Sequence, residues 1–316
     1  MDMQDILKKL GQLGIVPVIK IDDVENAVPL AKALCDGGLP CAEITFRTDA
    51  AEESIRRITK ELPHMLVGAG TVLTTEQADR ALAAGAKFMV SPGLNPKVVQ
   101  HCVDKGVLIT PGCATPSDIE RAIELGLGVV KFFPAGTYGG INAIKALSAP
   151  YPALKFIPTG GVNAKNLNDY LSFSKIVACG GSWMVDAALI NAGDFAAIEK
   201  LTREAVQAML GFSIMHVGVN CADDKEADAV AKLFCSAFGF EYKMGNSSIF
   251  CGTSVEVMKT QYLGEKGHIA IGTNYLDRGQ AYLEGLGFTF NMDTKNAKAI
   301  YLNEQFGGFA VHLLQR

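Results

Sequence analysis

The chain has 316 residues, of which 49% are hydrophobic and 20% are charged, and its formal net charge at pH 7 is −4. This length allows one large and one small domain, and the hydrophobic fraction argues against intrinsic disorder. The acidic balance and the single tryptophan disfavour a nucleic-acid partner, and no apolar run reaches the roughly 18 residues that a membrane span needs.

The amino-terminal segment and the cysteines suggest a cytoplasmic protein. The segment MDMQDILKKLGQLG has the period of an amphipathic helix and lacks the apolar region and cleavage site of a signal peptide. The eight cysteines form no CxxC pair, and most of them lie inside apolar segments. Such cysteines are typical of a reducing compartment, so we expect a soluble, cytoplasmic protein with free thiols.

From Ile15 to about Ser182 the chain repeats one pattern, in which a short β-branched run leads through a turn into an amphipathic helical segment. The strand candidates are IVPVIKI, CAEITFR, MLVGAGT, KFMVSPG, VLITPGC, GVVKFFPAG, KFIPTGG and KIVACGGS. Strands that alternate with helices pair in parallel through right-handed crossovers. Eight such units predict an α/β protein with a closed (β/α)8 TIM barrel rather than an open doubly wound sheet, and no GxGxxG follows the first strand.

The pattern changes after a long helix candidate, AGDFAAIEKLTREAVQAML. We place a domain boundary near Phe212 and expect domains at residues 1–212 and 213–316. The second region contains an internal repeat, in which HVGVN at His216 is answered by HIAIG at His268. Each half fits one strand, one helix and three further strands, so we expect a smaller α+β domain made of two βαβββ repeats.

One lysine, Lys131, lies within the apolar strand candidate GVVKFFPAG. The carboxyl ends of the strands form the active site in a barrel of this kind, and the alternation of side chains directs Lys131 into that site. Partial burial and the nearby Arg47 favour the neutral amine, which can condense with a carbonyl to a Schiff base. A structural ion pair with Glu43 is the alternative interpretation.

Two further patterns favour the catalytic interpretation. Glu43 and Arg47 lie four residues apart in EITFR, so both are expected on the same side of the second strand. A carboxylate there can transfer protons for an iminium intermediate, and a guanidinium can bind a substrate carboxylate through two hydrogen bonds. PTGG and CGGS end the seventh and eighth strands, where this fold often binds phosphate through loop amides. An ordinary turn would explain either glycine pair alone, but two pairs on these two strands favour a phosphate site.

Six motifs, EITFRT, VGAGTV, SPG, KFFPA, PTGG and GGSW, follow one another as in the 2-keto-3-deoxy-6-phosphogluconate (KDPG) and 4-hydroxy-2-oxoglutarate (KHG) aldolase family. Residues 5–210 resemble that family. The resemblance implies a carbon–carbon lyase that cleaves KDPG to pyruvate and glyceraldehyde 3-phosphate, and often KHG to pyruvate and glyoxylate. It also implies that no cofactor is needed, that the partners are small phosphorylated keto acids and pyruvate, and that the protein is a trimer.

The resemblance also implies roles for single residues. Lys131 matches the lysine that forms the Schiff base, and Glu43 matches the general acid/base that acts through water. The positions that match substrate-binding residues are Arg47 and Thr71 for the pyruvyl carboxylate, Pro92 and Phe133 for the pocket around it, Thr159 for the configuration at C4, and Gly160, Gly161, Gly180, Gly181 and Ser182 for the phosphate.

Other activities of this fold stay open at this point. One is an aldolase for the 6-phosphogalactonate epimer, and another is a phosphate-binding isomerase. Thr159 favours the gluco substrate through the resemblance alone.

The duplicated βαβββ pattern resembles the vicinal-oxygen-chelate superfamily, which includes glyoxalase I and extradiol dioxygenases. In that superfamily the metal ligands come from the first and last strands of each half, and the matching positions are His216, Glu256, His268 and His312. Imidazoles and a carboxylate suit Zn, Ni, Fe or Mn. A glutamate is commoner at the last position, so His312 is a departure that leaves the metal undefined. A metal-dependent lyase or isomerase, a small-molecule sensor and a structural or oligomerisation module all stay open for this region.

Overall fold

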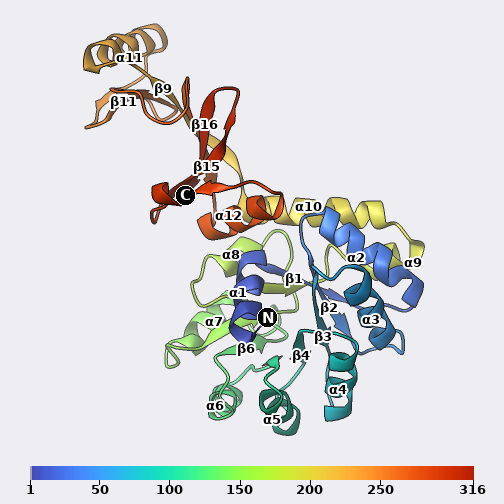
Figure 1. The fold of residues 1–316 in the computed structure, drawn as a ribbon. Coiled ribbons are helices and arrows are strands. Elements are labelled where there is room, and N and C mark those ends of the chain that lie inside the picture. Colours follow the sequence, from blue (N-terminus) through green and yellow to red (C-terminus); the bar gives the residue numbers. More distant parts are fainter. Residues whose placement is uncertain (1) are drawn as a thin grey trace. The chain divides into compact units, whose positions relative to one another are not determined.

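A computed structural model describes residues 2–316 of the chain. The chain divides between Met209 and Leu210 into two compact units (Figure 1). None of the helices in the described range is both long enough and apolar enough to cross a membrane.

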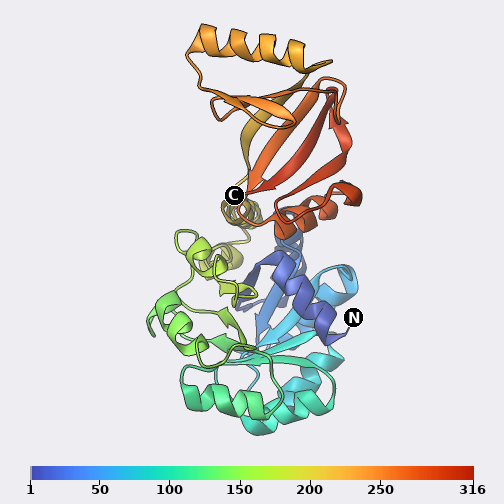
Figure 2. The same cartoon turned by 90° about the vertical axis from the view of Figure 1, so that its left-hand side faces the viewer.

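The first unit alternates strands with helices. Its strands are β1 (Ile15–Ile19), β2 (Cys41–Thr45), β3 (Leu66–Gly70), β4 (Phe88–Ser91), β5 (Leu108–Pro111), β6 (Val129–Phe132), β7 (Lys155–Pro158) and β8 (Cys179–Gly181). Its helices, which lie around the strands (Figure 2), are α1 (Met3–Leu13), η1 (Val24–Asn26), α2 (Ala27–Asp36), α3 (Ala51–Glu61), α4 (Thr75–Ala83), α5 (Pro96–Asp104), α6 (Pro116–Glu124), α7 (Gly140–Ser148), α8 (Leu167–Leu171), α9 (Ala187–Ala192) and α10 (Phe195–Leu210).

Local sequence explains where several of these helices begin. The Thr74 side chain accepts a hydrogen bond from the backbone of Gln77 at the start of α4. At α6, Thr115 and Asp118 form a reciprocal capping box, and Pro116 takes the first turn, where its missing N–H costs nothing. These short helices therefore start immediately after the loops that follow β3 and β5.

All strand pairings described in the first unit are parallel. Six strands form a sheet in the order β5-β4-β3-β2-β1-β8, and β6 pairs with β7. Single parallel bridges connect Gly112 after β5 with Lys131 on β6, and Thr159 after β7 with Gly180 on β8. The prediction of a parallel α/β fold is confirmed for this unit.

An apolar cluster fills the amino ends of the strands. Ile6 and Leu10 of α1 pack with Cys41, Leu66 and Phe88, which are the first residues of β2, β3 and β4. This packing closes the amino ends, so an opening for a substrate must lie at the carboxyl ends.

The second unit contains one mixed sheet. Its strands are β9 (Ser213–Asn220), β10 (Tyr242–Met244), β11 (Ser248–Cys251), β12 (Val255–Met258), β13 (Gly267–Thr273), β14 (Phe290–Asn291), β15 (Ala299–Phe306) and β16 (Phe309–Gln315), and its helices are α11 (Asp224–Phe238), α12 (Leu276–Gly285) and η2 (Met292–Thr294). The sheet order is β10-β11-β12-β9-β13-β16-β15-β14. Each half thus runs strand, helix, three strands, as expected from the sequence, and the halves meet where β9 pairs antiparallel with β13.

Each half of the second unit has its own small apolar core. Ala227 and Ala231 of α11 pack with Ile249 and Val257 from the first half of the sheet. Leu276 of α12 belongs to a separate cluster of residues from the second half. The helices are therefore anchored on opposite halves of the sheet.

Candidate functional site

Lys131 and Glu43 form a buried pair inside the first unit. Lys131 on β6 exposes 5% of its surface and Glu43 on β2 exposes 3%. The Nζ atom of Lys131 lies 3.7 Å from Oε1 of Glu43, which is an ion-pair distance but too long for a hydrogen bond. Glu43 Oε1 is buried and has no hydrogen-bond partner among the described residues. Because such oxygens normally accept a hydrogen bond, this one is available to a further polar group.

The position of Glu43 depends on a neighbouring glycine. A Cβ atom on Gly70 would lie 2.2 Å from Glu43 Oε1, so any side chain there would displace the carboxylate. Glu43, Lys131 and Thr159 also line a cavity of about 10 Å³. A space of this size is close to the minimum that holds one water molecule.

The aromatic ring of Phe133 lies beside Lys131. β6 ends at Phe132, and the turn that follows begins at Phe133. Phe133 lies two residues beyond Lys131, a spacing that puts both side chains on the same side, and the centroid of its ring lies 5.0 Å from Nζ.

One expectation about Arg47 needs correction. β2 ends at Thr45, so Arg47 lies in the following turn and the side-chain alternation of a strand does not position it. Its position is set instead by a hydrogen bond from Arg47 Nε to Thr71 Oγ1 (3.2 Å). Thr71 follows β3 and has φ of 56°, a left-handed conformation that is uncommon for a residue with a Cβ atom.

A cavity of about 370 Å³ lies at the carboxyl ends of the strands. The expected site residues that line it are Arg47, Phe133, Thr159, Gly160, Gly161, Gly181 and Ser182. Thr159 lines both this cavity and the small one beside Lys131 and Glu43. Thr71 is linked to the larger cavity through Arg47, whereas Pro92 and Gly180 are not among the lining residues.

The glycines at the ends of β7 and β8 are required by close contacts. Gly160 and Gly161 have φ values of +88° and +81°, which other residues rarely adopt. A Cβ atom on Gly181 would lie 1.9 Å from the ring of Trp183, and one on Gly180 would lie 2.4 Å from Thr159 Oγ1. Gly180 therefore makes room for Thr159, a role that the sequence did not reveal.

Two charged residues of the larger cavity were missed by sequence reasoning. Lys20 follows β1, and Asp186 is the N-cap residue of α9. Lys20 could have been found, because it lies near the end of the first strand candidate, IVPVIKI, and such positions converge in this fold. Asp186 lies well beyond the last strand, and no motif indicated it.

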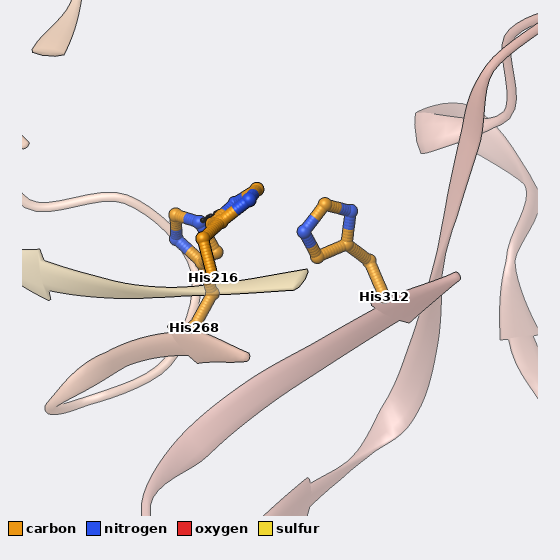
Figure 3. Close-up of side chains that lie close together, drawn as sticks. All are labelled: His216, His268 and His312. Atoms are coloured by element: carbon orange, nitrogen blue, oxygen red, sulfur yellow. Dashed lines mark hydrogen bonds between the residues drawn. The ribbon is translucent and has the colours of Figure 1, made fainter. Parts of the chain in front are cut away.

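The second unit brings together all four residues that the sequence suggested as metal ligands. Figure 3 shows that His216, His268 and His312, from β9, β13 and β16, have their imidazoles facing one another. One potential ligand atom from each of the three lies within 4.8 Å of the others. Glu256 Oε2 on β12 lies 3.2 Å from His216 Nε2 and 3.1 Å from His268 Nε2.

The hydrogen bonding of this cluster leaves ring nitrogens available. Ser248 donates to Glu256 Oε1 at 2.6 Å, which orients Oε2 toward the histidines. Burial raises the pKa of Glu256, but hydrogen bonds with His216, His268 and Ser248 outweigh it and hold that pKa well below its usual range. Both ring nitrogens of His312 are buried without a hydrogen-bond partner among the described residues. Burial, with the neighbouring histidines, lowers the pKa of His312 to about 4, so its neutral imidazole is favoured. A set of three imidazoles and one carboxylate fits a divalent transition metal.

The first unit combines parallel strands, a buried lysine beside a carboxylate and a glycine-lined cavity at the carboxyl ends. These features define an α/β enzyme with its site at the carboxyl ends of the strands.

Comparison with known proteins identifies the family. Residues 6–201 match the family model of KDPG and KHG aldolases. The "2-dehydro-3-deoxy-phosphogluconate aldolase" of Treponema pallidum is 51% identical over 205 residues, which cover 65% of this chain and 98% of the relative. That of Haemophilus influenzae is 49% identical over 203 residues, which cover 64% of this chain and 96% of the relative. The chain therefore belongs to the KDPG and KHG aldolase family, whose members are carbon–carbon lyases, and its first unit is an aldolase.

Solved structures agree with this assignment. The KDPG aldolase of Legionella pneumophila, crystallised with pyruvate captured as a covalent carbinolamine, is 36% identical with a TM-score of 0.61. The alignment covers 63% of this chain and 97% of that protein.

Proposed function

We propose that the first unit is a class I aldolase that cleaves KDPG to pyruvate and glyceraldehyde 3-phosphate through a Schiff base on Lys131. The observation that carries this proposal is the buried pair of Lys131 and Glu43, with 3.7 Å between Nζ and Oε1. A lysine and a carboxylate that do not saturate each other's hydrogen bonds can act on a substrate placed between them. The names of the relatives and the covalent pyruvate adduct of the Legionella enzyme support the same reaction.

The reaction begins when the neutral amine of Lys131 attacks the C2 ketone. Loss of water from the resulting carbinolamine gives a protonated imine, which withdraws electrons from the bond between C3 and C4. No metal is needed for this step, because the iminium supplies the polarisation that a Lewis acid would otherwise supply. The small cavity beside Glu43 and Lys131 has room for the water through which protons move.

Cleavage requires a base at the C4 hydroxyl. Glu43, acting through water, removes that proton, the bond between C3 and C4 breaks, and glyceraldehyde 3-phosphate leaves. The electron pair stays on the enamine of pyruvate, which is protonated at C3. Hydrolysis of the imine then releases pyruvate and restores the free amine of Lys131.

The other expected site residues have binding roles in this proposal. Arg47, held by Thr71, binds the carboxylate of the pyruvyl group, and Phe133 and Pro92 shape the pocket around it. Thr159, which lines both cavities, contacts the C4 hydroxyl and so reads its configuration. The backbone amides at Gly160, Gly161, Gly180, Gly181 and Ser182 bind the phosphate.

A pyruvate-release assay with KDPG, its 6-phosphogalactonate epimer and KHG tests the substrate assignment. We expect cleavage of KDPG with the highest kcat/KM and slower cleavage of KHG. A higher kcat/KM for the epimer would replace the gluco assignment by the galacto aldolase, which is the second candidate for this unit. Turnover by the Lys131→Met variant at the wild-type rate would exclude the Schiff-base mechanism for either epimer.

Several features of architecture belong to the same proposal. The bridges from β5 to β6 and from β7 to β8 support closure of the eight strands into a (β/α)8 TIM barrel. Residues 1–212 then form the aldolase domain and residues 213–316 a separate domain. We also propose a homotrimer located in the cytoplasm, and light scattering of the full chain tests the trimer.

For the second unit we propose a vicinal-oxygen-chelate domain that binds one divalent metal, such as Zn, Ni, Fe or Mn. His216, Glu256, His268 and His312 would hold the ion, and their convergence supports the site. A bound ion would supply Lewis-acid chemistry, which suits a metal-dependent lyase or isomerase. Elemental analysis of the full chain after incubation with each metal tests the site, with a variant that lacks His216 and His268 as control. Equal metal content in both proteins would favour the sensor or structural role instead.

A further inference from the structure

The larger cavity of the first unit contains few formal charges among its lining residues. Arg47 and Lys20 are positive and Asp186 is negative. Asp186 accepts a hydrogen bond from the backbone of Ala188 at 2.8 Å, so its carboxylate already serves as a helix cap. Arg47 is held by Thr71 at the side of the cavity where the pyruvyl carboxylate is proposed to bind. Lys20 is thus the cation that remains for a second anionic group of the substrate.

The strand register brings Lys20 close to the phosphate-binding loops. β1 pairs in parallel with β8, and Pro17 lies opposite Gly181. The residues that follow Pro17 therefore run beside the loop that follows Gly181, which includes Ser182. Lys20 lies one residue beyond the end of β1 and lines the same cavity as Gly160, Gly161 and Ser182.

In the protein without substrate, Lys20 has an exposed counterion. Its Nζ lies 2.6 Å from Asp22 Oδ1, and the two side chains expose 45% and 40% of their surfaces. Ion pairs this accessible are weak, because water and salt screen them. A phosphate held by backbone amides next to Lys20 can therefore compete with Asp22 for the ammonium group.

Backbone amides alone do not distinguish well between anions. They are neutral dipoles, so they bind a carboxylate, a sulfate or a phosphate with similar geometry. A full positive charge favours the group with the larger negative charge, which is the phosphate dianion. A lysine at the edge of an amide site therefore adds selectivity for a phosphorylated substrate.

We propose that Lys20 is a specificity residue that binds the substrate's terminal phosphate, together with the loop amides at the ends of β7 and β8. This inference rests on the proposed aldolase function for the identity of the substrate. Three observations carry the inference independently of the chemistry at Lys131. Lys20 lines the cavity, it lies in register beside the loop after β8, and its counterion is weakly held.

The test compares KDPG with the same sugar acid lacking the phosphate. In the Lys20→Met variant we expect the preference for the phosphorylated substrate, as a ratio of kcat/KM values, to fall by about 10- to 100-fold, the range for one lost charge-assisted hydrogen bond. The effect should appear mainly in KM. The Lys20→Arg variant should keep most of the preference. Lys155→Met is the matched control, because Lys155 is exposed at the amino end of β7, opposite the site.

A second measurement does not depend on turnover. Calorimetry with inorganic phosphate on the full chain should show weaker binding in Lys20→Met and tighter binding in Asp22→Asn, in which the counterion is removed. An unchanged substrate preference together with an unchanged phosphate dissociation constant in Lys20→Met would overturn the role of Lys20. If the wild-type protein cleaved no substrate but Lys20→Met still lost phosphate affinity, the aldolase proposal would fail while the anion site would stand.

Discussion

Lys131 Nζ and Glu43 Oε1 lie 3.7 Å apart although their strands, β6 and β2, are not hydrogen-bonded neighbours. The contact therefore spans two parallel strands that are not paired, rather than running along one face of a pair. Their contact leaves Glu43 Oε1 free to accept a hydrogen bond, and it lies next to a cavity of about 10 Å³. This geometry separates the roles of a nucleophile and a proton-transfer group.

Glu43→Gln tests the proton-transfer role. The amide keeps the size of the carboxylate but cannot serve as a base, so we expect kcat for KDPG to fall by about 10²- to 10⁴-fold. Formation of a pyruvate adduct on Lys131 should still be detectable by mass spectrometry, because the amine is retained. A variant with wild-type kcat would show that Glu43 has only a structural role.

Gly70→Ala tests whether the carboxylate must occupy its observed place. The added Cβ atom would lie 2.2 Å from Glu43 Oε1, so we expect a loss of kcat comparable to that of Glu43→Gln without any change at Glu43 itself. Circular dichroism should confirm that the protein still folds. Gly128→Ala is the matched control, because a Cβ atom at Gly128 meets nothing within 4 Å. Equal activity of the two alanine variants would contradict the steric argument.

Gly218→Ala makes the same kind of test for the cluster in the second unit. Its Cβ atom would lie 2.1 Å from Cε1 of His268, so the imidazole must move although all four proposed ligands remain. We expect a metal affinity at least about 10-fold weaker in competition with a chelator, the range seen when the support of a ligand is lost. Gly285→Ala, where a Cβ atom meets nothing, is the control. Metal binding as tight as in the control would argue against His268 as a ligand.

The stability of the metal-free second unit should depend on pH through His312. Burial and the neighbouring histidines lower the pKa of His312 to about 4 from its usual value of 6.5. Between these values the unfolded chain binds more protons than the folded one, so stability is lost as the pH falls from 6.5 to about 4. The loss should reach roughly 3 kcal/mol at most, at about 1.4 kcal/mol for each pKa unit.

Chemical denaturation in the presence of a chelator measures this dependence. The His312→Leu variant should lose less stability over the same pH interval, because it lacks the group that titrates. Equal pH slopes for the variant and the wild type would show that His312 does not carry the effect.

Sequence reasoning succeeded where a periodic pattern or a repeat determines position. The strand ends placed Lys131 and Glu43 together, and the resemblance to the vicinal-oxygen-chelate superfamily indicated His216, Glu256, His268 and His312, which lie together in the structure. It failed for Arg47, because alternation of side chains does not reveal that β2 ends at Thr45. Arg47 is held by a contact with Thr71 on a different loop, which no local pattern encodes.

The steric roles of glycines were also beyond the sequence. Gly70 and Gly218 look like ordinary strand residues, but each makes room for a side chain of a proposed site, Glu43 or His268, on a neighbouring strand. Such a role depends on how strands pack in three dimensions. A single sequence gives no measure of the distance between a glycine and the side chains of the neighbouring strand. Lys20 is a different case from these glycines. The sequence showed its place near the end of the first strand candidate, but it did not show that Lys20 lines the larger cavity.

The most direct test of the central claim is reduction of the protein with borohydride in the presence of pyruvate, followed by peptide mapping. We expect one pyruvate-derived adduct on the peptide that contains Lys131, and no adduct in the Lys131→Met variant. An adduct on another lysine, or full aldolase activity of a protein that forms no adduct, would contradict the Schiff-base assignment.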